Sequence, residues 1–349
     1  MTENSHFPEF DSGRRMRQRR KKNRPVLVTM LTLLGLVLVA AIVAGMYVMN
    51  LANTFNSKSQ TIEKAFPAPE KRPQKNDDGS MNILLMGSDS RNGSDENLVE
   101  SSDGSRSDTM MLMHIPGNRD SVYVMSIMRD TWTEIPGYGE HKINAAAAFG
   151  GVPLTVETVE GLFDTRVDHV AIIDFSGFKA LTDALDGVKI NNPIAFQSSG
   201  SMGEAFPQGV QTLNGESALK FVRERKAFSD GDYQRVKNQQ LFVKAIMSRF
   251  LTADTLTNPG RIADVVSDFS PYISVDSGFD AGTAGSLGVS LRNIRTPDVH
   301  MFTLPTNGTG TSADGQSIVV KDEAAIAEIT EALKSDSMDD YWATSEAAG

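Results

Sequence analysis

The amino-acid sequence predicts an α/β fold with a mixed sheet, and three observations lead to this class. Apolar runs of strand length recur along the chain, beginning with residues 81–87. Segments with apolar residues at helical spacing follow several of these runs, the longest over residues 232–250. Glycine, proline and asparagine separate the segments and mark turns. The 349 residues, 40% of them hydrophobic, are ample for one large core or two ordinary ones.

The first 49 residues combine a basic segment with an apolar one. Residues 1–25 form a basic tail, and its lysines and arginines are Arg14, Arg15, Arg17, Arg19, Arg20, Lys21, Lys22 and Arg24. Residues 26–49 contain no charged side chain and have the length of a transmembrane helix. Because positive charge favours the cytoplasmic side, we expect a single-pass membrane protein with its N-terminus in the cytoplasm and its main domain extracellular.

The remaining elements can be assigned in chain order. Residues 50–79 are rich in proline and polar residues, which is typical of an extracellular stalk or linker. The folded domain is expected over residues 80–335, with strands at 81–87, 110–115, 121–127, 170–175, 188–190 and 299–304. Residues 116–118 are a turn signal, so the second and third of these strands should form a hairpin.

Four helices are expected between and after these strands. Ser176 can cap a helix that ends near Gly187, and Asn214 can cap another through Val222. The third runs over residues 232–250, and a last helix should cover residues 322–333. We expect residues 336–349 to form a flexible C-terminal tail.

Short arginine and aspartate motifs lie at the ends of these elements. Asp89 and Arg91 follow the first strand, Arg106 and Asp108 precede the second, and Arg129 follows the third. A further group of motif residues lies around the start of the longest helix and consists of Arg223, Arg225, Asp232, Arg235 and Gln239. Guanidinium groups bind phosphate oxygens bidentately, and carboxylates among them suit Mg²⁺, so the pattern favours a metal-assisted site for a pyrophosphate.

Other chemistries are disfavoured by the residue types present. The absence of cysteine excludes a thiol nucleophile and a zinc–cysteine site. The histidines show no metal-ligand spacing, and no Walker motif or Gly-x-Ser-x-Gly elbow occurs. The net charge is -10 although the tail is basic, which argues against nucleic-acid binding by the main domain.

Several motifs in this order resemble the LytR-CpsA-Psr family of bacterial cell-envelope proteins. The resemblance rests on residues 81–91, 106–110, 126–130, 142–146, 213–219 and 223–225, together with Asp232, Arg235 and Gln239. It implies an α/β/α sandwich of three layers with a mostly antiparallel central sheet. It also implies a phosphotransferase that moves a glycopolymer from a polyprenyl-pyrophosphate carrier onto peptidoglycan through a phosphodiester.

The resemblance also implies roles for individual residues. Arg129, Arg223, Arg225, Asp232 and Arg235 would be catalytic, and Asp232 would orient an arginine. Arg91, Arg106, Lys142, Asn144 and Gln239 would bind the pyrophosphate carrier. Asp89 and Asp108 would hold the cofactor, Mg²⁺.

Two positions depart from the family pattern. Met128 occupies a position that is usually proline, which predicts a looser aim for Arg129. Asn238 occupies a position that is frequently arginine, which leaves the longest helix with one charge fewer.

Two alternative functions stay open. The alternatives are hydrolysis of the pyrophosphate, with water as acceptor, and a non-enzymatic protein that binds polyprenyl lipids.

Overall fold

The computed structural model describes residues 24–88, 107–200, 203–250 and 258–348. Only the backbone is described for residues 24–40, 107–108, 250 and 346–348. The chain divides into one unit over Met1–Met49 and a second over Asn50–Gly349. The site lies entirely in the second unit.

Helix α1 (Arg24–Lys58) contains the whole apolar segment 26–49 for which a membrane span is expected. Among the described residues, no helix combines the length and the apolar character that crossing a bilayer requires. Residues 1–23, which make up nearly all of the basic tail, lie outside the described residues.

A mixed seven-stranded sheet forms the centre of the second unit, as the sequence predicts. Its strands, in spatial order, are β1 (Gln60–Ile62), β12 (Ile273–Asp276), β7 (His169–Asp174), β2 (Met81–Ser88), β3 (Ser107–Ile115), β4 (Val122–Ile127) and β13 (Val299–Thr303). In this described sheet the pairs β12–β7, β2–β3 and β3–β4 are antiparallel, and the pairs β1–β12, β7–β2 and β4–β13 are parallel. The expected hairpin of β3 and β4 is therefore confirmed, whereas the expected predominance of antiparallel pairs is wrong.

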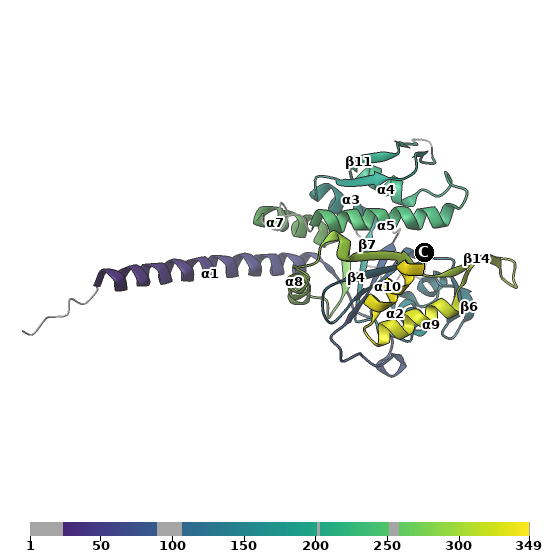
Figure 1. The fold of residues 1–349 in the computed structure, drawn as a ribbon, viewed down its shortest axis with the longest axis horizontal. Helices are drawn as coiled ribbons and strands as arrows, with labels where there is room; N and C mark the ends of the chain where they lie inside the picture. Colours follow the sequence, from purple (N-terminus) through teal and green to yellow (C-terminus); the bar gives the residue numbers. More distant parts are fainter. Residues whose placement is uncertain (1–23, 89–106, 201–202, 251–257, 349) are drawn as a thin grey trace, which may run out of the picture. The chain divides into compact units, whose positions relative to one another are not determined.

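Helices pack on both faces of this sheet (Figure 1). One face is covered by α2 (Ala145–Phe163), α9 (Glu323–Lys334) and α10 (Met338–Ala348). The other face is covered by α5 (Gly231–Phe250) and α8 (Ala281–Ser290). Alternate residues of each central strand enter the two cores, with Leu84 and Leu112 on the α2 side and Ile83 and Met111 on the α5 side.

A second apolar cluster holds a group of helices together above the α5 face. It joins α5 to α3 (Phe175–Ala184), α4 (Gly215–Arg223) and α7 (Pro259–Phe269). It also includes residues of the ribbons β8 (Val188–Asn192) with β11 (Gly209–Leu213) and β9 (Phe196–Gln197) with β10 (Ala205–Phe206). The remaining ribbons are β5 (Trp132–Ile135) with β6 (Gly139–Lys142) and β14 (Thr306–Thr311) with β15 (Ser317–Lys321). Single 3₁₀ turns occur at Pro69–Lys71, Ser270–Tyr272 and Thr296–Asp298.

Residues 50–79, expected to form a stalk, belong to the folded unit. Strand β1 pairs in parallel with β12, and Ile62 and Ala65 are buried in the core. Arg72 lies 2.6 Å from Glu160 of α2 in a buried ion pair. The prediction failed because a three-residue strand carries no periodicity and its partner lies more than 200 residues away in the sequence.

The end of the chain is also ordered, against the expectation of a flexible tail. Helix α10 buries Met338, and Tyr341 and Trp342 pack against the same core. The Tyr123 hydroxyl donates a hydrogen bond to Asp339. Burial of these aromatic rings outweighs the usual fraying of a terminus.

Candidate functional site

The strand directions bring several motif-bearing loops to one edge of the sheet. Strands β2 and β7 are parallel, and β4 runs in the same direction because both β2 and β4 are antiparallel to β3 between them. Their carboxyl ends therefore lie at the same edge. Arg129 follows β4, Phe175 follows β7, and Thr109 lies opposite Gly87 where β3 begins. Such an edge is where open α/β sheets usually bind ligands.

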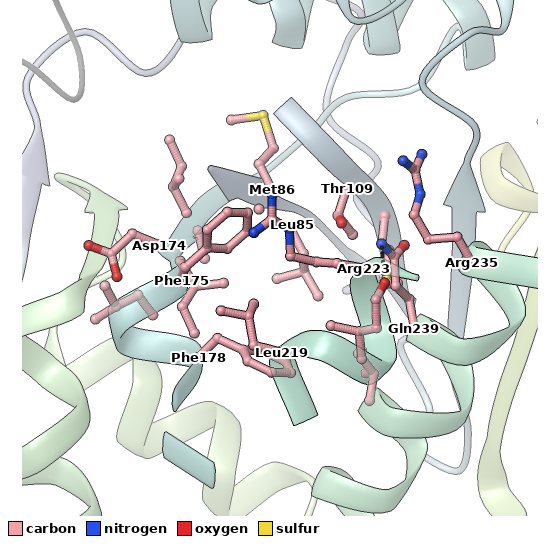
Figure 2. Close-up of a pocket in the computed structure, with 18 of the residues that line it drawn as sticks. Leu85, Met86, Thr109, Asp174, Phe175, Phe178, Leu219, Arg223, Arg235 and Gln239 are labelled. Atoms are coloured by element: carbon pink, nitrogen blue, oxygen red, sulfur yellow. Dashed lines mark hydrogen bonds between the residues drawn. The ribbon is translucent and has the colours of Figure 1, made fainter. Parts of the chain in front are cut away.

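A cavity of about 390 Å³ lies between this part of the sheet and α3, α4 and α5. Much of its wall is apolar, with Leu85, Met111, Phe178, Leu219 and Val243 among the lining residues. Four predicted arginines and one predicted glutamine also line it, namely Arg129, Arg223, Arg225, Arg235 and Gln239. Figure 2 shows the apolar side chains, Arg223, Arg235 and Gln239 around the same space.

Among the described residues, the acidic residue that lines this cavity is Asp174, and it is already engaged. Its side chain caps α3 by accepting a hydrogen bond from the Gly177 N–H at 2.6 Å. The sequence had indicated Ser176 as this cap, and the structure corrects the cap to Asp174. The arginines therefore give the cavity a positive character that suits an anion with several oxygens.

Asp232 connects three of these arginines. It accepts a hydrogen bond from Arg235 Nη2 at 2.9 Å, and its other oxygen lies 3.6 Å from Arg225 Nη1. Arg129 Nε is 3.9 Å from the same carboxylate and 3.6 Å from Asp130. Asp232 is thus placed to orient more than the single arginine that the sequence suggested. One carboxylate also reduces the repulsion between three like charges held close together.

Arg223 is held in another way. Its guanidinium lies over the Phe175 ring at 4.3 Å from the ring centre, a cation–π contact. Figure 2 shows the Arg223 side chain extending toward that ring.

The chain between Arg223 and Arg225 is fixed by the buried Glu224. This carboxylate accepts hydrogen bonds from the backbone N–H groups of Ser199, Arg225 and Ala227 and from the Ser199 hydroxyl. Burial raises its pKa, but the hydrogen bonds outweigh burial and hold the pKa below the ordinary value. Glu224 is therefore the anchor of the loop that carries Arg223 and Arg225.

Lys142 and Asn144 lie outside this cavity. They line a neighbouring hollow of about 360 Å³, together with Arg129, which also lines the cavity. Lys142 Nζ is 3.5 Å from Asp130. Asn144 precedes α2, but its side chain makes no capping hydrogen bond to that helix. The structure therefore separates the predicted site residues into two adjoining groups that share Arg129.

The predicted magnesium ligands are described only in part. Asp89, Arg91 and Arg106 lie outside the described residues, and Asp108 is described by its backbone alone, within β3. No group of three or more potential metal-binding side chains occurs in the part of the chain that the structure describes. The strand pairing does place Ser88, which precedes Asp89, opposite Ser107, which precedes Asp108.

Comparison with known proteins identifies the family. Residues 45–335 match the model of the LytR_cpsA_psr family. The chain belongs to this family. A relative from Bacillus subtilis (strain 168), the polyisoprenyl-teichoic acid--peptidoglycan teichoic acid transferase TagU, is 30% identical over 322 residues, which cover 91% of this chain and 97% of the relative.

Two solved structures of similar proteins have the same fold. The crystal structure of B. subtilis TagV aligns with a TM-score of 0.63 at 23% identity, covering 74% of this chain and 98% of TagV. TagT bound to LIIa-WTA aligns with a TM-score of 0.57 at 26% identity, covering 76% of this chain and 94% of TagT.

The two departures from the usual LytR-CpsA-Psr pattern have structural explanations. Met128 is fully buried and packs with Val236 of α5 and Val319 of β15, so packing holds the turn that carries Arg129. Asn238 is buried and donates to the Phe221 carbonyl at 3.4 Å, which ties α5 to α4. Asn238 does not line the cavity, so the expected loss of a ligand-facing charge has no support from its position.

Sequence reasoning missed several residues that shape the site. Phe175 and Phe178 read as ordinary apolar residues, although both line the cavity and Phe175 positions Arg223. A sequence signal did exist for Phe175, because it is the last residue of the strand expected over residues 170–175, and the carboxyl ends of such strands are favoured ligand sites. No local signal indicated Glu224 as a loop anchor, since its partner Ser199 lies 25 residues away.

Proposed function

We propose that this protein transfers a glycopolymer from a polyprenyl-pyrophosphate carrier to peptidoglycan and forms a phosphodiester. The observation that carries the proposal is the cavity, in which an apolar wall and four arginines face one space. A polyprenyl diphosphate has the same two parts, a hydrocarbon chain and a charged pyrophosphate. The names of TagU and of TagT bound to LIIa-WTA support this substrate class and a transferase reaction.

Each described residue has a task in this reaction. The apolar wall holds the part of the lipid nearest the phosphates and excludes water from it. Arg129, Arg225 and Arg235 bind pyrophosphate oxygens and stabilise the charge that develops on the leaving lipid phosphate. Asp232 keeps these guanidinium groups in place before the substrate arrives. Gln239 donates to the Val222 carbonyl at 3.4 Å, which keeps it at the cavity wall.

We also propose that Asp89 and Asp108 hold Mg²⁺ beside the arginines. The strand register supports this, because Asp89 and Asp108 directly follow Ser88 and Ser107 in the sequence. Ser88 and Ser107 are paired at the edge of the sheet where the arginines lie. Two carboxylates with substrate phosphates are a usual donor set for Mg²⁺. When bound, the ion supplies positive charge to the bridging phosphates. We propose that Arg91 and Arg106, which lie between Ser88 and Ser107 in the sequence, also bind the pyrophosphate.

The location that we propose is the outer face of the cell membrane. The support is the uncharged sequence of residues 26–49 and the basic tail that precedes it. A membrane anchor keeps the cavity near a lipid-linked donor. A label that reacts only on the outside of intact cells should reach a cysteine introduced in the second unit, and a cysteine introduced in the tail should stay unlabelled.

The test of the reaction uses the full-length protein in detergent with a defined lipid-linked glycan and peptidoglycan oligomers, with and without Mg²⁺. We expect glycan joined to peptidoglycan by a phosphodiester, and polyprenyl phosphate as the other product. Free glycan phosphate without linkage, in the presence of acceptor, would identify a hydrolase instead. Binding of the lipid with no product under any condition would leave only a lipid-binding protein.

A further inference from the structure

The second hollow, which adjoins the arginine cavity, has the features of a sugar-binding subsite. Its lining residues include Arg129, Asp130, Lys142, Asn144, Phe149 and Gln316. They come from the turn after β4, from β6, from the start of α2 and from the loop between β14 and β15. The first cavity is built mainly from strand ends and from α3, α4 and α5. The two spaces therefore have different walls and share Arg129.

Phe149, which lines this hollow, belongs to an exposed pair of aromatic rings whose other member, Tyr138, lies directly behind it and outside the lining. The Phe149 ring stacks on Tyr138 with ring centres 4.6 Å apart and an angle of 16° between the planes. His141 meets Phe149 edge-on at 5.1 Å. Tyr138 is 49% exposed and Phe149 is 39% exposed, so both keep much of their apolar surface in water. Grouped apolar surface that stays exposed commonly marks a binding site.

The backbone fixes this pair of rings. The Tyr138 N–H donates to the Ile135 carbonyl at 2.9 Å, which closes a turn between β5 and β6. Gly137 occupies the third position of that turn with φ +83°, a conformation that favours glycine. The Tyr138 hydroxyl also donates to the Phe149 carbonyl at 3.3 Å, so the tip of the hairpin is tied to α2. A ring pair held by two elements is ready for a ligand without a large loss of entropy on binding.

The polar residues of the hollow complement the rings. Asp130 and Lys142 lie 3.5 Å apart, and Asn144 and Gln316 supply amide groups. Aromatic faces carry negative charge and attract the C–H groups of a pyranose ring, while carboxylate, ammonium and amide groups bind its hydroxyl and acetamido groups. This combination suits an uncharged or weakly charged amino sugar better than a lipid chain.

The reaction geometry decides which sugar binds here. In phosphoryl transfer the attacking and leaving oxygens are roughly in line through phosphorus. The leaving lipid phosphate occupies the apolar cavity, so the attacking hydroxyl must come from a space that reaches Arg129 from outside that cavity. The second hollow meets this requirement because Arg129 lines it as well.

We infer that this hollow binds the amino-sugar glycan strand of the peptidoglycan acceptor, with a sugar ring against Phe149 and Tyr138. The inference rests on the proposed transferase function. Phe149 and Tyr138 act here as acceptor-binding residues and take no part in holding the donor. They set the specificity for the acceptor, and they place its hydroxyl beside the phosphate that Arg129 binds.

The test compares Phe149→Ala, Tyr138→Ala and Phe149→Leu with wild type in the full-length protein. Phe149→Leu keeps most of the apolar volume and removes the aromatic face, which separates ring stacking from folding. Val210→Ala is the control, because Val210 is 64% exposed on β11 and lines neither space. Steady-state transfer is measured against the concentration of peptidoglycan oligomers at saturating donor, and donor affinity is measured separately without acceptor.

We expect the KM for acceptor to rise about tenfold in the three ring variants, which corresponds to the loss of one aromatic contact. Donor affinity should stay at the wild-type value in all three variants, and Phe149→Leu should also keep the wild-type melting temperature. An unchanged KM would overturn the inference. A loss of donor affinity with an unchanged KM would also overturn it, and would assign the hollow to the glycan of the donor.

The inference can be tested even if no transfer occurs. Direct binding of soluble peptidoglycan oligomers to the full-length protein needs no turnover, and it should weaken about tenfold in the same ring variants. If wild type binds the oligomers in this way and yet transfers nothing, the proposed function fails while the subsite stands. If wild type transfers glycan but the variants bind the oligomers normally, the subsite fails while the function stands.

Discussion

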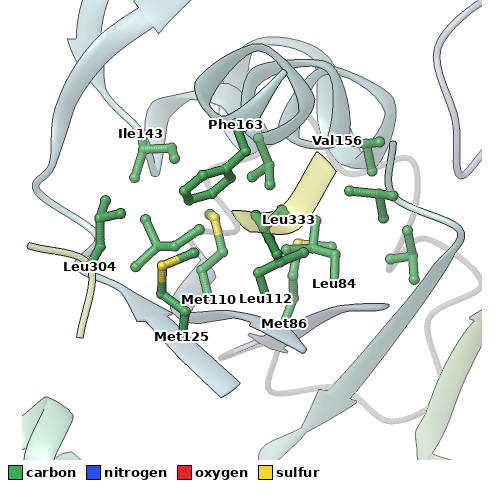
Figure 3. Packing of buried hydrophobic residues seen from close by; sticks show 14 of the residues in the cluster. Leu84, Met86, Met110, Leu112, Met125, Ile143, Val156, Phe163, Leu304 and Leu333 are labelled. Carbon is green, nitrogen blue, oxygen red and sulfur yellow. The ribbon is translucent and has the colours of Figure 1, made fainter. Parts of the chain in front are cut away.

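The two faces of the central sheet carry similar apolar side chains but are used differently. On the α2 face, Leu84 and Leu112 are fully packed against Phe163 of α2 and Leu333 of α9 (Figure 3). On the other face, Leu85 and Met111 of the same strands border the cavity. The difference comes from the helices, because α3 and α4 pack chiefly on α5 and α7 in a cluster of their own and leave space above the strands.

This difference shows how one fold supplies both stability and a binding site. The packed face buries its apolar side chains, among them Leu84 and Leu112, so it stabilises the sheet whose edge carries the arginines. The open face gives up some of that contact and gains room for a ligand. Substitutions on the first face should therefore change stability, and those on the second should change ligand binding and catalysis.

The largest expected effect comes from a matched pair of phenylalanines. Phe163 on the packed face is 1% exposed, whereas Phe178 borders the cavity. Phe163→Ala should destabilise the protein by about 3–5 kcal/mol, because it opens a hole among fixed neighbours. Phe178→Ala should cost clearly less, since part of its ring already faces open space. Denaturant titration measures both, and equal losses of unfolding free energy would remove the distinction between the faces.

The second effect is a loss of transfer activity when an arginine that lines the cavity is removed. Arg129→Ala and Arg225→Ala should each lower transfer by about 10²–10³-fold, the usual cost of removing one charge-stabilising donor. The melting temperature should stay close to wild type, because both side chains lie at the ligand edge and not in a packed cluster.

A matched arginine provides the control for these variants. Arg261 pairs with Asp186 at 2.5 Å and does not line the cavity, so Arg261→Ala should leave transfer unchanged. Near-normal transfer by both Arg129→Ala and Arg225→Ala would refute their assignment to the site.

Most strands of the sheet could be predicted from sequence because they are local apolar runs, and the start of α4 could be predicted because Asn214 is a recognisable cap, whereas helix α2 of the packed face was not predicted. The Asn214 side chain does accept from the Ser217 N–H at 2.9 Å. Strand β1 and helix α10 were missed, since their order depends on partners far away in the sequence. Local pattern therefore identified the elements that are stable through their own burial, and it missed those that depend on distant contacts.

The functional site also has a part that could be predicted from the sequence and a part that could not. The arginines could be predicted by residue type and by their position at strand ends, and the structure does bring Arg129, Arg223, Arg225 and Arg235 to one cavity. The separation of Lys142 and Asn144 into a second hollow could not be predicted. It depends on how the β5–β6 hairpin and α2 sit beside the sheet, which the motif residues alone do not determine.

The third effect is a pH dependence at the loop that carries Arg223 and Arg225. Glu224 has a pKa below its ordinary value of 4.5 in the folded protein. Its contribution to stability is therefore fully present above that ordinary value and is lost as the pH falls through the lower, folded pKa. Glu224→Gln should lower the melting temperature at neutral pH, and the gap from wild type should narrow as the pH falls below 4.5.

A neighbouring glutamate separates this effect from a general change of charge. Glu216 lies in the first turn of α4 with a side chain that is 62% exposed, so Glu216→Gln should change the melting temperature little at any of these pH values. A gap between Glu224→Gln and wild type that stays constant down to strongly acidic pH would contradict the role of the carboxylate as loop anchor.

The smallest expected effect on transfer tests whether Phe175, at the cavity, positions Arg223. Phe175→Leu keeps an apolar side chain at the cavity but removes the ring over which Arg223 lies at 4.3 Å. A cation–π contact of this kind is worth about 0.5–2 kcal/mol, so transfer should fall by roughly two- to thirtyfold. Because Phe175 acts through Arg223, the loss should vanish when Arg223→Ala is already present, and a double-mutant cycle of transfer rates measures this coupling. If the two losses simply multiply, Phe175 contributes to the cavity wall alone and Arg223 is oriented by other contacts.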